Sequence, residues 1–158
     1  MSVDVGSVFT LRYNRIIVST AITILQVKAG AANGFQVTRA WISQGASAVS
    51  ATANIALLRK SSAATVTAAA LGTTLFAHDP ATTSGVSLGT TATGYTATSE
   101  GTDSDEIWSQ GFNTLIGALY LPTPEERIFV PPGGIIALKF TVAPASATWT
   151  AGITFKES

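Results

Sequence analysis

Hydrophobic and polar residues alternate along much of the chain with the two-residue period that is typical of β-strands. The pattern is clearest near the end of the chain, where one face carries Trp149, Ala151, Ile153 and Phe155. In the segment before it, the inner face is expected to carry Ile136, Leu138, Phe140 and Val142. The outer face is expected to carry Ala137, Lys139 and Thr141. A turn is predicted between the two segments at Pro144-Ala145-Ser146. An antiparallel β-sandwich requires strands of this kind, with one apolar and one more polar face.

The first half of the chain carries the same signal with one irregularity. Alternation over residues 16–28 changes phase by one residue at Ile24-Leu25. This slip predicts a bulge or bend that lets one long strand serve both sheets. Asn33-Gly34 predicts a turn into a strand over Phe35–Ser43. The buried face of that strand is expected to carry Phe35, Val37 and Trp41.

The middle of the chain is less regular. Residues 61–75 are rich in Ala and Thr and leave a short helix at 68–71 as an alternative to strand. The carboxylates between Glu100 and Glu106 predict an acidic loop. Further strands are expected at residues 55–60, 88–98, 107–121 (as one or two strands) and 127–130.

These segments amount to about eight strands separated by turns roughly every 8–12 residues, the spacing of sandwiches and jelly rolls. The expected fold class is therefore all-β, a single antiparallel β-sandwich that is jelly-roll-like. A chain of 158 residues suits one such domain, which we place at residues 16–158. Residues 1–15 then form an N-terminal arm or an edge strand.

The charge content favours a subunit of an assembly. Hydrophobic residues make up 46% of the chain, charged residues only 11%, and the formal net charge is zero. Low charge promotes association, and the cores of protein interfaces are depleted in charge. The first ten residues lack the basic start of a signal peptide, and the most apolar stretch, 16–27, is too short to span a bilayer. We therefore expect neither a leader sequence nor a membrane partner.

Residues suited to catalysis or metal binding are scarce. There is no cysteine, and the one histidine, His78, precedes Asp79-Pro80, which predicts a turn rather than a catalytic pair. Asp103-Ser104-Asp105 resembles the start of a calcium loop, but the positions that need a glycine and a bidentate acid hold Trp108 and Thr114. Phosphate-binding motifs and a basic patch for nucleic acid are also missing. These features predict no enzyme, no cofactor, no metal site and no nucleic-acid partner.

The three tryptophans differ in their expected roles. Trp41 and Trp149 fall on apolar faces of alternating strands, which favours packing in the core. Trp108 follows the acidic residues and is the best candidate for an exposed contact, with burial as the alternative.

Several motifs together resemble those of small jelly-roll proteins among the virion proteins of tailed bacteriophages. They are Arg39-Ala40-Trp41-Ile42-Ser43-Gln44, Phe112-Asn113, the run from Leu119 to Arg127, Val130-Pro131-Pro132-Gly133-Gly134 and the closing 149–157. The resemblance in layout covers residues 16–157. Such proteins are capsid decoration or cement proteins, and their family carries no catalytic residues.

The resemblance implies a protein on the capsid exterior that is assembled in the host cytoplasm. Its partners would be the major capsid protein of the same virion and further copies of itself, as a homotrimer. Four residues near the N-terminus, with Trp108, are the expected partner contacts: Phe9, Arg12, Tyr13 and Arg15. The alternative is a receptor- or glycan-binding head of a phage fibre or tail, for which exposed aromatics and acids around 103–108 would be the site.

Overall fold

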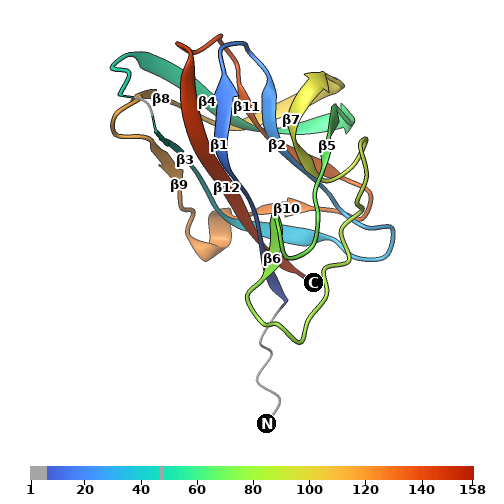
Figure 1. The fold of residues 1–158 in the computed structure, drawn as a ribbon. Coiled ribbons are helices and arrows are strands. Elements are labelled where there is room, and N and C mark those ends of the chain that lie inside the picture. Colours follow the sequence, from blue (N-terminus) through green and yellow to red (C-terminus); the bar gives the residue numbers. More distant parts are fainter. Residues whose placement is uncertain (1–6, 47) are drawn as a thin grey trace.

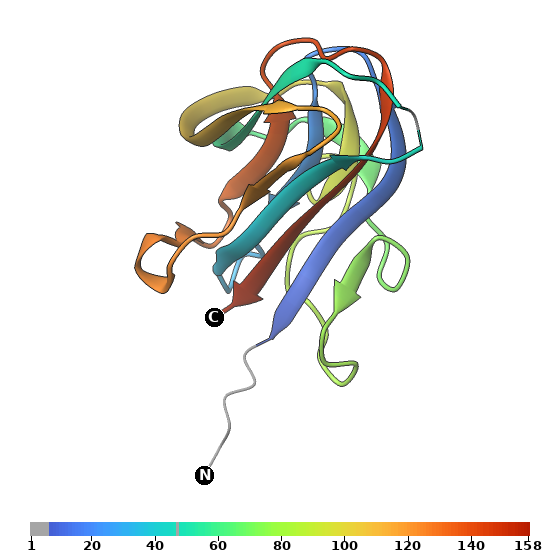
Figure 2. The same cartoon turned by 90° about the vertical axis from the view of Figure 1, so that its left-hand side faces the viewer.

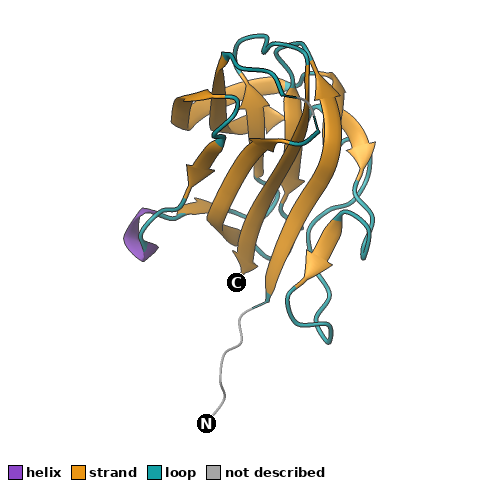
Figure 3. Ribbon diagram, turned by 60° about the vertical axis from the view of Figure 1, so that its left-hand side comes forward, coloured by secondary structure: helices purple, strands orange, loops and turns teal. Residues whose placement is uncertain are grey.

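The computed structural model describes residues 7–46 and 48–158, with the side chain of Arg15 excepted. Twelve strands and one 3-10 turn, η1 (Pro124–Glu126), form two six-stranded antiparallel sheets (Figures 1 and 3). The first sheet contains β1 (Val8–Val18), β3 (Phe35–Gln44), β6 (Leu75–Ala77), β9 (Ala118–Tyr120), β10 (Ile128–Val130) and β12 (Ala147–Glu157). The second contains β2 (Thr23–Lys28), β4 (Thr52–Ser62), β5 (Thr65–Ala68), β7 (Gly94–Ser99), β8 (Thr102–Asn113) and β11 (Ile135–Phe140).

The strand order is that of a jelly roll, as the sequence predicts. The order β1-β12-β3, continued by β9 and β10, faces the order β2-β11-β4-β8. Successive strands therefore cross between the sheets in the double Greek-key pattern of an eight-strand jelly roll. The count of twelve rather than eight has two causes. An insertion between β4 and β8 adds β5, β6 and β7, and the sixth strand of the frame is split into β9 and β10.

One hydrophobic core lies between the sheets. Its largest fully buried side chains include Trp149, Phe9, Phe35, Phe140 and Phe155. Trp149 contacts Phe140 with ring centroids 5.2 Å apart, joining β12 in one sheet to β11 in the other. The predicted inner faces of these two strands are confirmed except at Val142, which lies beyond the end of β11 and is exposed. Ala137 is buried on the other face of β11, where we expected solvent, and contacts Ala56 and Leu58.

The predicted phase slip near Ile24 is confirmed, but its expected consequence is wrong. Pairing of β2 with β11 shifts register so that Ile24 has no partner, which makes it a bulge. The chain does not continue as one long strand from residue 16, because it bends at residues 19–22. This bend separates β1 in the first sheet from β2 in the second.

Several other predictions in the chain's middle need correction. Residues 100–106 are not a loop, because β8 begins at Thr102. The strand expected over 88–98 is confined to β7, and β5 occupies the start of the segment where a helix was the alternative. The part of the N-terminal segment from Val8 onward is strand β1, which pairs with β12 on one side and β6 on the other. Residues 1–6 of the predicted arm lie outside the described residues.

Candidate interaction surface

One side of the sandwich has a surface without charge. No residue from Ile107 to Pro124 is charged, and this segment forms the second half of β8, the turn after it and β9. Figure 1 places β8 and β9 on one side of the molecule, and Figure 2 turns that side toward the viewer. Half of the ten large hydrophobic residues exposed in the described chain belong to this segment: Ile107, Leu115, Ile116, Leu119 and Leu121. We call this surface, residues 107–124, the uncharged flank.

A groove of about 450 Å³ crosses the uncharged flank where the edges of the two sheets meet. Trp108 from β8 and Tyr120 from β9 lie in its wall, with ring centroids 5.3 Å apart. Ile107 has no partner in the pairing of β8 with β4, so this bulged residue points away from the regular ladder. It lines the groove together with Leu121 and Glu126. The residues that line the groove are therefore mostly hydrophobic or aromatic in type, with one carboxylate among them.

Carboxylates border the uncharged flank at both ends of its sequence. Asp105 and Glu106 precede it in β8, and Glu125 and Glu126 follow it in η1, all four exposed. The nearest cation in sequence, Arg127, is half-buried, and its Nε is buried without a hydrogen-bond partner among the described residues. An apolar centre with a charged border is the usual composition of a protein–protein interface.

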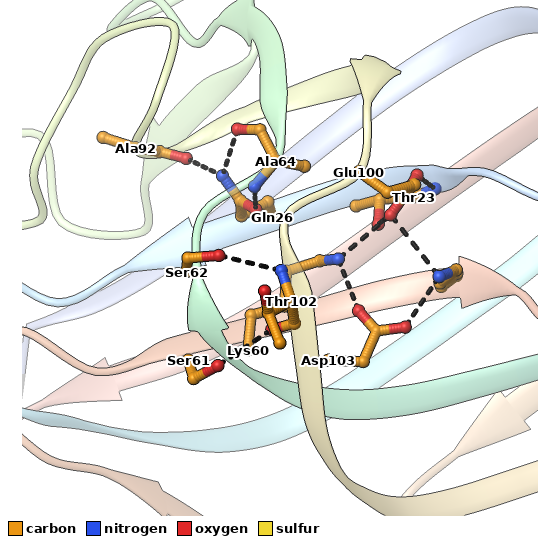
Figure 4. Close-up of polar contacts among 11 residues, drawn as sticks. Thr23, Gln26, Lys60, Ser61, Ser62, Ala64, Ala92, Glu100, Thr102 and Asp103 are labelled. Carbon is orange, nitrogen blue, oxygen red and sulfur yellow. Dashed lines mark hydrogen bonds and ion pairs between the residues drawn. The ribbon is translucent and has the colours of Figure 1, made fainter.

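Glu100, just before β8, and Asp103, near its start, have a different role, because they form an ion-pair network with two lysines (Figure 4). Lys60 Nζ, with a fully buried side chain, lies 3.0 Å from Glu100 Oε2 and 2.6 Å from Asp103 Oδ1. Lys139 Nζ lies 2.7 Å from Asp103 Oδ2 and 3.5 Å from Glu100 Oε2. Thr23 donates to Glu100 through its backbone N–H and its hydroxyl. The network fixes the start of β8 against β4, β11 and β2.

The network shifts the pKa of three of its members. Burial alone would raise the pKa of Glu100, but donation from Thr23 and Lys60 outweighs it and lowers the pKa below 4.5. Burial also opposes ionisation of Asp103, and the two lysines outweigh it and lower the pKa below 3.8. For Lys139, the desolvation that would lower the pKa is outweighed by Asp103 and Glu100, so the pKa is raised above 10.5. All three groups are therefore charged at neutral pH.

The outer face of the first sheet provides a second distinctive surface. Trp41 points outward there, and the Arg39 guanidinium lies 4.2 Å from the centroid of its ring. The sequence prediction of a core role for Trp41 is wrong, because Thr38 is bulged in the pairing of β3 with β12 and reverses the phase of alternation. Ala40 and Ile42 are buried in its place. Arg12 on β1 stacks on Phe76 of β6 at 4.9 Å.

The residues proposed as partner contacts do not come together in one place. Phe9 lies in the core, 1% exposed, and Tyr13 stacks on Tyr95 across the sandwich with ring centroids 3.9 Å apart. Arg12 is exposed on the outer face of the first sheet. Trp108 is half-buried and lines the groove of the uncharged flank. The side chain of Arg15 lies outside the described residues.

His78 and Asp79 each take part in a hydrogen bond. His78 Nε2 lies 2.7 Å from Thr10 Oγ1, and Asp79 Oδ1 accepts a hydrogen bond from the backbone N–H of Ala81. Asp79 thus caps the predicted turn. Within residues 7–46 and 48–158, no three His, Asp or Glu side chains are grouped so that they could hold a metal ion. Over the same residues, no helix has the length and apolar character needed to cross a membrane.

The fold defines a class: an all-β jelly-roll domain, here with an uncharged flank on one side. Comparison with protein-family models, with curated proteins and with solved structures finds no match. Sequence reasoning missed the flank as a unit. Its signal in the sequence is the charge-free run from Ile107 to Pro124, but the runs 40–58, 61–78 and 80–99 also lack charge, so the run alone does not mark a surface.

Proposed function

We propose that this chain is a virion structural protein of a tailed bacteriophage, a decoration or cement protein on the capsid exterior. It stabilises the coat lattice through contacts with the major capsid protein and with further copies of itself, without catalysis. Two observations support the proposal. The first is that the sequence resembles small jelly-roll virion proteins. The second is that the uncharged flank exposes apolar side chains, such as that of Ile116 at 85% exposure, and exposed apolar patches of this kind mark interaction sites.

The uncharged flank is the observation that carries the proposal. A charge-free surface with an acidic border is suited to a protein partner, and nucleic acid would be repelled by that border. Burial of the exposed leucine and isoleucine side chains against neighbouring subunits stabilises an assembly at roughly 25 cal/mol per Å² of apolar area. Such contacts would hold coat subunits together.

The test uses particles of the phage that encodes the chain. Electron microscopy of purified particles at side-chain resolution is expected to show the chain in symmetric copies that bridge coat subunits. Particles that lack the chain are expected to release their genome at a lower temperature, and adding back the purified chain should restore the original temperature. Density for the chain at the tail tip alone, or its absence from particles, would refute the proposal.

A second candidate function is recognition of a glycan by a fibre or tail head. The observation that favours it is the pairing of Trp108 and Tyr120 beside Glu126 in one groove, because sugars stack on aromatic rings and donate to carboxylates. Titration with host surface glycans, followed by nuclear magnetic resonance of the tryptophan indoles, distinguishes the two functions. Selective shifts at the Trp108 indole, together with loss of glycan binding in Trp108→Ala, would favour the glycan.

A further inference from the structure

We infer that the uncharged flank binds the outer face of the first sheet of a second copy of this chain, in a heterologous contact that repeats around a closed ring. The inference rests on the proposed function in one respect, that the chain works as an assembled subunit. It adds which two surfaces meet and how the contact is arranged.

The border of the flank excludes a contact between two identical flanks. An isologous contact would bring Asp105, Glu106, Glu125 and Glu126 of one copy toward the same four carboxylates of the other. Like charges placed opposite each other at an interface disfavour binding. The cations near these carboxylates are the half-buried Arg127, which follows Glu126 in sequence, and Lys139, which lines a pocket with Glu106. The flank therefore needs a partner surface that is basic and partly apolar.

The outer face of the first sheet has that character. Its outward positions on β1, β3 and β12 include Arg12, Arg39 and Lys156 and, among the described side chains, no Asp or Glu. Apolar area is supplied by Trp41 and by Ile17, which is 73% exposed. Cations and carboxylates thus lie on different surfaces of a chain whose net charge is zero.

The local structure holds the Trp41 ring against this face. Gly152 on β12 is paired with Trp41 on β3, and a Cβ built at Gly152 would lie 2.2 Å from the indole ring. The absence of that Cβ lets the ring lie along the sheet, with Arg39 above it. The exposed side chains of Ile107 and Leu121, which line the groove of the flank, are the apolar groups that would contact this ring in a second copy.

The two surfaces meet along one edge, which favours a closed ring over an open filament. Leu119 belongs to the uncharged flank and pairs with Trp41 in the ladder of β9 with β3. Complementary surfaces that share an edge rotate each successive copy about an axis near that edge. A heterologous contact forms a ring when this rotation returns to the first copy, and an open helical filament when it does not.

The test uses two double variants of the purified full chain. The flank variant carries Ile107→Arg and Leu121→Arg, and the face variant carries Arg12→Glu and Arg39→Glu, all at positions with solvent-exposed side chains. Light scattering is expected to show an oligomer for the unaltered chain and the 16.2 kDa monomer for each variant alone. An equimolar mixture is expected to form a 1:1 dimer, because each variant retains the surface that the other lacks.

The controls place the same changes elsewhere. Leu88→Arg alters an exposed hydrophobic residue of the insertion, and Lys28→Glu reverses a charge on the second sheet; both are expected to leave the oligomer intact. Circular dichroism confirms that each variant is folded. An unaltered chain that is monomeric at micromolar concentration, an oligomer that survives either double variant, or a mixture that stays monomeric would each overturn the inference.

The outcome is separable from that of the proposed function. A ring that forms in solution while the chain is missing from particles would refute the virion role and leave the inference intact. The opposite outcome is a chain that is found on the capsid but whose oligomeric state is unchanged by these substitutions. It would support the virion role and refute the inference.

Discussion

The indole ring of Trp41 lies on the backbone of Gly152, its partner across the β3–β12 ladder. The atoms Cζ2 and Cη2 of the ring are 2.2 Å and 2.3 Å from the position that a Cβ at residue 152 would take. A glycine in the middle of a strand ordinarily weakens it, so its presence here is explained by the ring that covers it. The pair determines the orientation of the aromatic side chain on which Arg39 stacks.

Replacement of Gly152 by alanine tests this relationship. We expect Gly152→Ala to force the Trp41 ring off the sheet and to break its contact with Arg39, lowering the free energy of unfolding by about 1 kcal/mol. Gly111→Ala is the control, because the nearest atom to its new Cβ would be 3.4 Å away. Urea unfolding measures the free energy of unfolding of both variants. Equal stability of the two variants would show that the ring moves aside without loss.

The sandwich and its jelly-roll order follow from alternation that is local to each strand. The sequence correctly predicted the buried faces of β11 and β12 from Ile136 to Phe155, and it located the bulge at Ile24 from a change of phase. Trp41 was misplaced because the bulge at Thr38, between Val37 and Arg39, leaves no comparable signal in the sequence. A single bulge that the sequence does not reveal moves every later side chain of the strand to the opposite face of the sheet from the one predicted.

Long-range pairing explains why residues 100–106 were wrongly predicted to form a loop. The acids at residues 100–106 are typical of a solvated loop, and only the fold shows that Lys60 and Lys139 neutralise Glu100 and Asp103. These partners are about 40 residues apart in the chain, as Lys60 and Glu100 illustrate. Such pairing leaves no local pattern, whereas the uncharged run beginning at Ile107 can be read directly.

Thr96 holds an unusual backbone conformation that a substitution can relieve. Its φ is +50°, in the left-handed region, which strains a β-branched residue. We expect Thr96→Asn to stabilise the protein by about 0.5–1 kcal/mol, because asparagine tolerates this region. Thr98→Asn, in the same strand without a positive φ, is expected to be neutral or slightly destabilising. A melting temperature that falls in Thr96→Asn would contradict this reading of the strain.

Gln26 attaches the insertion to the second sheet. Its buried side chain donates to the carbonyl oxygens of Ala92 (2.6 Å) and Ala64 (3.3 Å) and accepts from the backbone N–H of Ala64 (2.9 Å). In Gln26→Leu these backbone groups lose their partner, so we expect a loss of roughly 2 kcal/mol. Hydrogen exchange at Ala64 should accelerate. Gln36→Leu, at an exposed position, is the matched control, and unchanged exchange in Gln26→Leu would remove the role assigned to this side chain.

The two lysines of the ion-pair network should differ in their contribution to stability. Lys60 has no exposed side-chain area, whereas the Lys139 side chain is 15% exposed. We expect Lys60→Met to lower the free energy of unfolding by about 3 kcal/mol, because two carboxylates lose their buried counter-charge. Lys139→Met is expected to have an effect of about 1 kcal/mol, closer to that of a surface pair. Denaturant titrations of both variants at pH 7 test the ranking, and a reversed order would refute it.

The same network predicts that stability falls in acid. The pKa values of Glu100 and Asp103 in the folded protein lie below their ordinary values of 4.5 and 3.8, so the unfolded chain binds more protons in this range. Their contribution is complete above about pH 5 and is lost as the pH falls through the lowered pKa values. The contribution of Lys139, whose pKa is raised above 10.5, is present at all these pH values and is lost only in strong alkali.

Unfolding measured between pH 7 and pH 2 checks this prediction. The double variant Glu100→Gln with Asp103→Asn is expected to be less stable at pH 7 and to show a shallower decline in acid, because the groups that titrate have been removed. Glu125→Gln, an exposed carboxylate in η1, is the control and should retain the steep decline. Since the slope of stability against pH reports the difference in bound protons, a double variant with the unaltered slope would place the acid sensitivity outside this network.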